Sequence, residues 1–61
     1  MITLTRENGQ PVLLNCDLIE TVEENAKSVI TLTTGNAVVV RERLHEIEAK
    51  VVEFKQKIYG R

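Results

Sequence analysis

The chain has 61 residues and a net charge of −1, with eight Lys or Arg, nine Asp or Glu, one Cys and one His. So short a chain forms at most one domain, and it buries only ~60% of its unfolded surface. One cysteine excludes an internal disulfide, and one His with one Cys is too few for a structural zinc site. We therefore expect self-association to supply the missing stability. The balanced charge argues against a large basic surface for nucleic acid or anionic lipid.

The sequence has no apolar run of 18 residues, so no membrane insertion is expected. Met1 leads directly into a strand pattern rather than into a signal peptide. A single cysteine, Cys16, also fits a reducing compartment. These features predict a cytoplasmic protein.

The first fifteen residues predict a β-hairpin. Apolar and Thr residues alternate from Ile2 to Thr5, and a second apolar run follows Pro11. Between them stands Asn8-Gly9, the strongest two-residue signal for a type I′ turn. We expect strands over Ile2–Glu7 and Gln10–Asn15.

Three more short strands follow. Asn15-Cys16-Asp17 has turn chemistry and could begin one helical turn. The next strand, Ile19–Glu24, is rich in Glu, which suits a solvent-facing or edge position. Strands over Val29–Thr33 and Ala37–Val40 follow, and the continuous apolar run of the last one predicts burial on both faces.

The stretch from Glu42 to Tyr59 predicts a helix. Its apolar residues recur at steps of 3, 4, 3 and 4 and so line one stripe: Leu44, Ile47, Val51, Phe54 and Ile58. No residue from Arg41 to Arg43 is a good N-cap, so we expect a frayed start, and Gly60 stands where a C′ residue would end the helix. The whole is an α+β single domain, residues 1–61, with a curled antiparallel β-meander over 1–40 and a C-terminal amphipathic helix over 42–59.

The helix is the expected self-association element. At ~1.5 Å per residue it spans ~25 Å, longer than a five-residue strand of ~17 Å, so its last turns should overhang the sheet. We expect a homo-oligomer through these residues: Leu44, Ile47, Val51, Phe54, Ile58 and Tyr59.

Four acidic residues gather between positions 17 and 24: Asp17, Glu20, Glu23 and Glu24. Strand alternation separates Glu23 from Glu20 and Glu24, which disfavours a metal site. The cluster is either a partner-facing patch or a solvated face. His45 and Cys16 have no neighbours in sequence that would make them catalytic, so we expect no enzyme activity, no cofactor and no metal.

Four segments in order resemble the FlbD family, also called the SwrD or swarming-motility family. They are Met1-Ile2-x-Leu4-Thr5-Arg6-x-Asn8-Gly9, Leu14-Asn15-x-Asp17-Leu18-Ile19-Glu20, Val29-Ile30-Thr31-Leu32-Thr33-x-Gly35 and Val39-Val40-x-Glu42. Thr34 and Arg43 depart from the pattern, at a turn and at a helix cap. The resemblance implies a small protein that supports flagellar or swarming motility through motor output, without catalytic or cofactor residues. Flagellar motor components become candidate partners, the motor periphery a candidate location, and Arg6 joins the candidate partner-facing residues.

A second resemblance, to the carbon storage regulator family, gives the alternative of an RNA-binding post-transcriptional regulator. It rests on the opening Leu4-Thr5-Arg6 and on Arg41 after the last strand, and it implies RNA contacts by Leu4, Arg6 and Arg41. The acidic stretch from Asp17 to Glu24 and the lack of basic excess depart from that family. No nucleic-acid partner is therefore expected.

Overall fold

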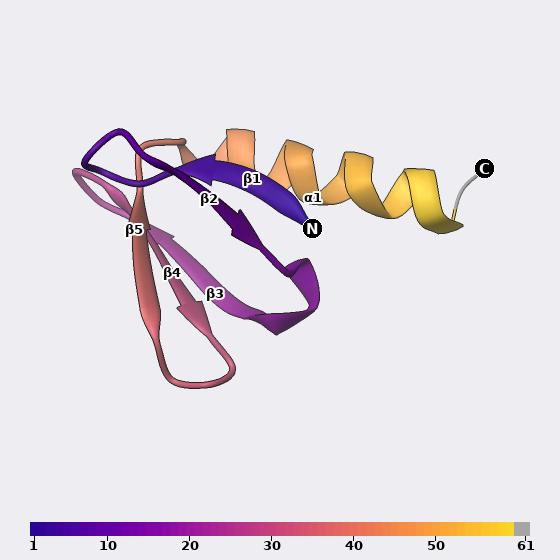
Figure 1. The fold of residues 1–61 in the computed structure, drawn as a ribbon, viewed down its shortest axis with the longest axis horizontal. Helices are drawn as coiled ribbons and strands as arrows, with labels where there is room; N and C mark the ends of the chain where they lie inside the picture. The colour runs from indigo at the N-terminus through magenta and orange to yellow at the C-terminus, as the bar shows by residue number, and fades with distance from the viewer. Residues whose placement is uncertain (60–61) are drawn as a thin grey trace.

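The computed structural model describes the backbone of residues 1–59 and the side chains up to Lys57 (Figure 1). The elements in this part of the chain are β1 (Ile2–Thr5), β2 (Pro11–Leu14), the 3-10 turn η1 (Cys16–Leu18), β3 (Ile19–Glu24), β4 (Ser28–Leu32), β5 (Ala37–Val40) and α1 (Leu44–Tyr59). Five antiparallel strands followed by one helix confirm the α+β class expected from the sequence.

The N-terminal hairpin pairs β1 with β2, with Ile2 opposite Leu14 and Thr5 opposite Pro11. Its turn is not the two-residue type I′ turn that Asn8-Gly9 predicted. The Arg6 carbonyl accepts from Gly9 N–H at 2.9 Å and Arg6 N–H donates to the Gln10 carbonyl at 2.8 Å, so three residues form the loop. Gly9 has φ 93°, as the αL position that ends such a loop requires.

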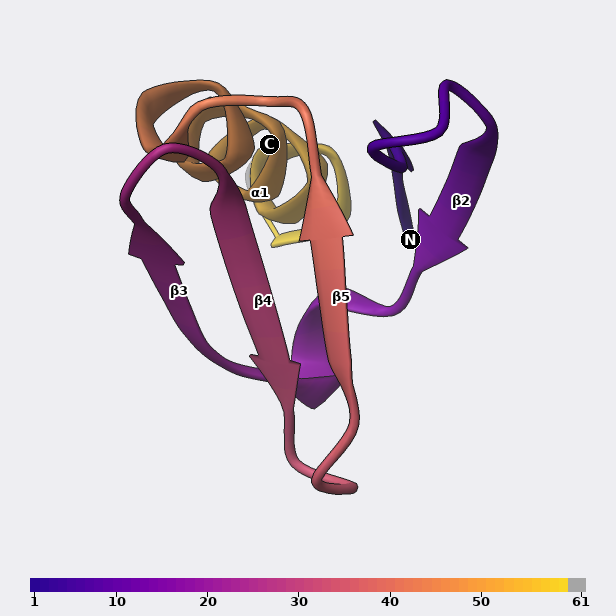
Figure 2. The same cartoon turned by 90° about the vertical axis from the view of Figure 1, so that its left-hand side faces the viewer.

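The second sheet has the order β3-β4-β5, so β3 and β5 are its outer strands. Every second residue of β4 and β5 points into the core, including Ile30, Val38 and Val40. The expectation that β5 is buried on both faces is wrong, because Ala37 is exposed and Val39 only half-buried. The outer face of this sheet is turned to the viewer in Figure 2, with α1 behind it.

The two sheets are joined at one corner. Arg6 forms an isolated bridge with Val40, and Arg41 N–H donates to the Thr5 carbonyl at 2.8 Å. These two contacts join the end of β1 to the end of β5. The two sheets therefore curl together around one core. That core contains Ile2, Leu4, Leu14, Cys16, Ile30, Val38, Val40 and Ile47.

Helix α1 packs over β1 and β3, and its C-terminal half runs past the ends of the strands (Figure 1). It begins at Leu44, two residues later than predicted, and its start is not frayed. Glu46 Oε1 accepts from Arg43 N–H at 2.7 Å, and Glu24 Oε1 accepts from Leu44 N–H at 2.9 Å. These carboxylates satisfy N–H groups that a helix start leaves unpaired, so a capping side chain at position 43 is not needed. The proposed stop at Gly60 lies outside the described residues.

Candidate interaction surface

Glu42, which the sequence placed in the helix, is instead the junction between the helix and the hairpin. Its carboxylate accepts from Thr5 N–H at 2.9 Å and from the Thr5 hydroxyl at 2.8 Å, and its carbonyl accepts from the buried Ser28 hydroxyl at 2.6 Å. Burial raises the pKa of Glu42, but the hydrogen bonds from Thr5 and from its own N–H, with the charge of Lys50, outweigh this. The pKa therefore lies below its ordinary value of 4.5.

Two of the four clustered acidic residues contact other parts of the same chain. Asp17 Oδ1 lies 3.4 Å from Lys55 Nζ, and Glu24 forms an ion pair with Arg43 in addition to its bond to Leu44 N–H. The contacts of Glu24 connect the start of α1 to β3, and the Asp17–Lys55 pair connects the C-terminal half of α1 to η1. Asp17 and Glu24 thus have a structural role that spacing along the sequence does not reveal.

Glu20 and Glu23 remain on the surface of β3. Both side chains are exposed, and neither has a hydrogen-bond or ion-pair partner among the described residues. β3 is an outer strand of its sheet, and a register irregularity interrupts its pairing between Ile19 and Thr21. Ile19 and Val22 both line the groove beside α1, so strict alternation, which was expected to separate Glu20 from Glu23, does not hold across Glu20. Arg6 is also exposed, but it lies on the far side of β5, at the bridge to Val40. The structure therefore separates Arg6 from the acidic pair.

The helical residues expected to self-associate divide into different environments. Ile47 is only 2% exposed and belongs to the core of the protomer, while Val51 and Phe54 are half-buried against that core. Leu44 turns away from the core and is 41% exposed. The side chains of Ile58 and Tyr59 lie outside the described part. The predicted stripe is thus largely covered by its own sheet as far as Phe54.

An apolar groove of about 320 Å³ runs between β3 and α1. Its walls are Cys16, Ile19, Val22, Leu44, Ile47, Glu48, Val51 and Val52. Val52, at 48% exposed, was not singled out by the sequence, because it falls outside the stripe at steps of 3 and 4. Its place in the groove depends on which side of α1 faces β3, and periodicity alone does not give that angle.

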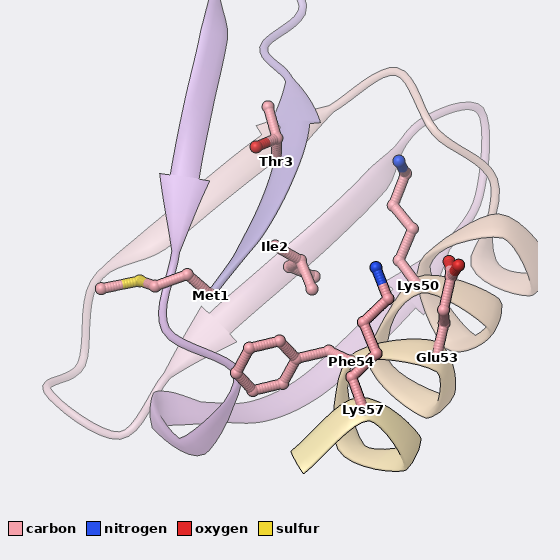
Figure 3. A pocket seen from close by; sticks show the side chains of 7 residues that line it. All are labelled: Met1, Ile2, Thr3, Lys50, Glu53, Phe54 and Lys57. Carbon is pink, nitrogen blue, oxygen red and sulfur yellow. The ribbon is translucent and has the colours of Figure 1, made fainter. Parts of the chain in front are cut away.

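A second and more polar groove, of about 230 Å³, lies on the other side of α1, against β1. Figure 3 shows the Phe54 ring lying towards Met1, with Lys50, Glu53 and Lys57 projecting from the helix. Two ammonium groups and one carboxylate line this groove, whereas Glu48 is the charged residue that lines the first. The two sides of α1 therefore differ in charge and in polarity.

A family model described as flagellar and swarming motility proteins, FlbD, matches residues 1–59. The chain belongs to the FlbD family. No curated protein and no solved structure matches it. Within this FlbD protein, several residues of the resembling segments have clear structural places: Leu4 in the core, Gly9 and Gly35 at turns with positive φ, and Glu42 at the junction with Thr5.

Among residues 1–59, no group of three or more His, Cys, Asp or Glu side chains is arranged to hold a metal ion. No helix in the same range is long and apolar enough to cross a membrane. Cys16 is buried in the core, as expected for a small apolar residue, and His45 is exposed on α1.

Proposed function

We propose that this FlbD protein is a non-enzymatic cytoplasmic protein that supports motor output by binding a protein at the periphery of the flagellar motor. Its membership of a motility family over residues 1–59 is the observation that carries the proposal. The exposed carboxylates of Glu20 and Glu23 on β3 support a contact with a basic surface. Charge complementarity of this kind governs encounter rate and specificity more than affinity.

The chemistry of the described surface also favours a binding role. Glu42, the group whose pKa departs clearly from its ordinary value, is bonded to Thr5 and does not face a groove. Catalytic sites more often place such a group in a cleft. The apolar groove beside β3 has Glu48 as its charged residue, which fits packing against another protein better than acid–base chemistry.

RNA-binding regulation is the competing function. Of its three implied contact residues, Leu4 is 1% exposed in the core, and the Arg41 guanidinium donates to the Glu7 carbonyl at 3.0 and 3.2 Å. Leu4 thus packs in the core, and the Arg41 side chain is bonded to the hairpin loop. A gel-shift assay at low salt, where phosphate contacts are strongest, measures RNA binding directly. Tight, salt-dependent retention of RNA would replace the proposal with this alternative.

The test of the proposed function is a deletion strain in which both swarming and flagella are measured. We expect poor spreading with a normal number of flagella, restored by expression of the wild-type chain. Loss of flagella would point to assembly or gene regulation instead. Normal swarming of the deletion strain under high-load conditions would contradict a role in motor output.

A further inference from the structure

The face of α1 that borders the apolar groove carries charged residues as well as apolar ones, unlike the face that packs on the core. At ~100° per residue, four of its residues fall within an arc of ~60°. They are Leu44, Glu48, Val51 and Lys55. Val52 lies next to this arc, and Leu44 and Val52 are the most exposed large apolar side chains of α1 up to Lys57.

The charges on this face are placed symmetrically about its apolar centre. Glu48 lies three positions before Val51, and Lys55 lies three positions after Val52. A two-fold axis passing between two antiparallel copies of α1 at this centre sets Glu48 of each copy opposite Lys55 of the other. Opposite charges then meet twice, and Val51 and Val52 of the two copies cover one another. Such a face is complementary to itself, as a two-fold interface requires.

We propose that the groove between β3 and α1 is occupied by α1 of a second copy of this chain, in an antiparallel two-fold dimer. Glu48 and Lys55 are complementary in charge and lie on either side of half-buried Val51 and exposed Val52, and this complementarity favours a second copy as the occupant. Lys55 also lies 3.4 Å from Asp17 of its own chain, and in the dimer the carboxylate of Glu48 from the second copy approaches it as well. This interface is separate from the carboxylates of Glu20 and Glu23, and it stands whether or not the motility proposal holds.

The dimer uses the helix as expected from the sequence, but with a different set of side chains. Ile47 and Phe54 pack inside the protomer, and Glu48, Val52 and Lys55 take their place at the interface.

Charge reversal tests the arrangement sharply. Each of the single variants Glu48→Lys and Lys55→Glu places like charges opposite each other twice per dimer, so each should weaken dimerisation by at least roughly tenfold, which is ~1.4 kcal/mol. The double variant Glu48→Lys/Lys55→Glu should recover the affinity to within a few-fold. Its recovery has to be intermolecular, because positions 48 and 55 are ~10 Å apart along one helix and the Asp17 ion pair stays lost.

Sedimentation equilibrium over a range of protein concentrations measures these dissociation constants, with circular dichroism confirming that each variant is folded. Val52→Gln should also weaken the dimer, because Val52 lies beside the two-fold axis. The control Leu13→Gln should not, since Leu13 is 61% exposed on β2, away from the groove. A wild-type chain that stays monomeric at high micromolar concentration overturns the proposal. A double charge-reversal variant as weak as the single variants overturns the antiparallel register, and a Leu13 variant as damaging as the Val52 variant overturns the face.

Discussion

Replacement of Glu42 by alanine should destabilise the fold more than any other change at a charged residue that the structure describes. The substitution removes two hydrogen bonds to the carboxylate, from Thr5 N–H at 2.9 Å and from the Thr5 hydroxyl at 2.8 Å. A hydrogen bond to a charged group contributes ~1.5–3 kcal/mol, and the half-buried setting favours the lower end. We expect a loss of ~2–4 kcal/mol, out of a total of ~3–9 kcal/mol for a chain of this size.

The effect should depend on pH in a defined direction. Because the pKa of Glu42 is lowered in the folded state, its contribution is present above the ordinary value of 4.5 and disappears as pH falls through the folded pKa. The wild-type melting temperature should therefore approach that of Glu42→Ala on acidification below about pH 4.5. At neutral pH a loss of ~2 kcal/mol corresponds to a decrease of ~8–16 °C.

The assay is thermal unfolding followed by circular dichroism, between pH 7 and pH 3, at one fixed protein concentration because dimerisation raises the apparent stability. Glu53→Ala is the matched control, since Glu53 is exposed on α1 and surface substitutions change stability by less than ~0.5 kcal/mol. A Glu42→Ala melting temperature within a few degrees of wild type at pH 7, or a gap that widens in acid, would refute the role given to this carboxylate.

Two further substitutions test the packing of the helix by the same unfolding measurement. Ile47→Ala should cost ~2–5 kcal/mol, because the side chain is 2% exposed and its loss leaves a cavity; a cost below 1 kcal/mol would mean that α1 does not pack on this core. Glu24→Ala should cost ~1 kcal/mol, because it unpairs Leu44 N–H and breaks the ion pair to Arg43. Equal melting temperatures for Glu24→Ala and the exposed-site variant Glu23→Ala would show that Glu24 does not cap the helix.

Sequence patterns predicted the strands better than the connections between them. The bounds of Ile19–Glu24 and Ala37–Val40 agree with β3 and β5, because alternation and turn residues are local signals. The hairpin turn was predicted with the wrong loop length, since Asn8-Gly9 also suits a three-residue loop whose last residue is a glycine in αL. Which of the two loop lengths forms depends on how β1 and β2 pair, and residues outside the turn determine that pairing.

The start of the helix, and which of its faces the sheet covers, depend on contacts between residues that are distant in sequence. Glu42 bonds to Thr5, 37 positions away in sequence, and Glu24 caps Leu44 from 20 positions away. Neither contact leaves a local signal, so the helix was predicted to start early and to fray. The stripe from Leu44 to Phe54 was found, but periodicity gave no means of telling which residues the sheet covers and which remain for a partner.

The proposed role in motor output is tested most directly by the rotation of single motors under high load. Tethered cells of a deletion strain would carry the wild-type chain, the variant Glu20→Lys/Glu23→Lys, or the control Glu7→Lys/Glu53→Lys, which changes the net charge equally at other exposed sites. Equal amounts of folded protein and equal numbers of flagella would be confirmed for each strain. We expect slow rotation only with the β3 variant. Wild-type rotation speed with the β3 variant, or equally slow rotation with the control, would contradict a motor contact through the acidic surface of β3.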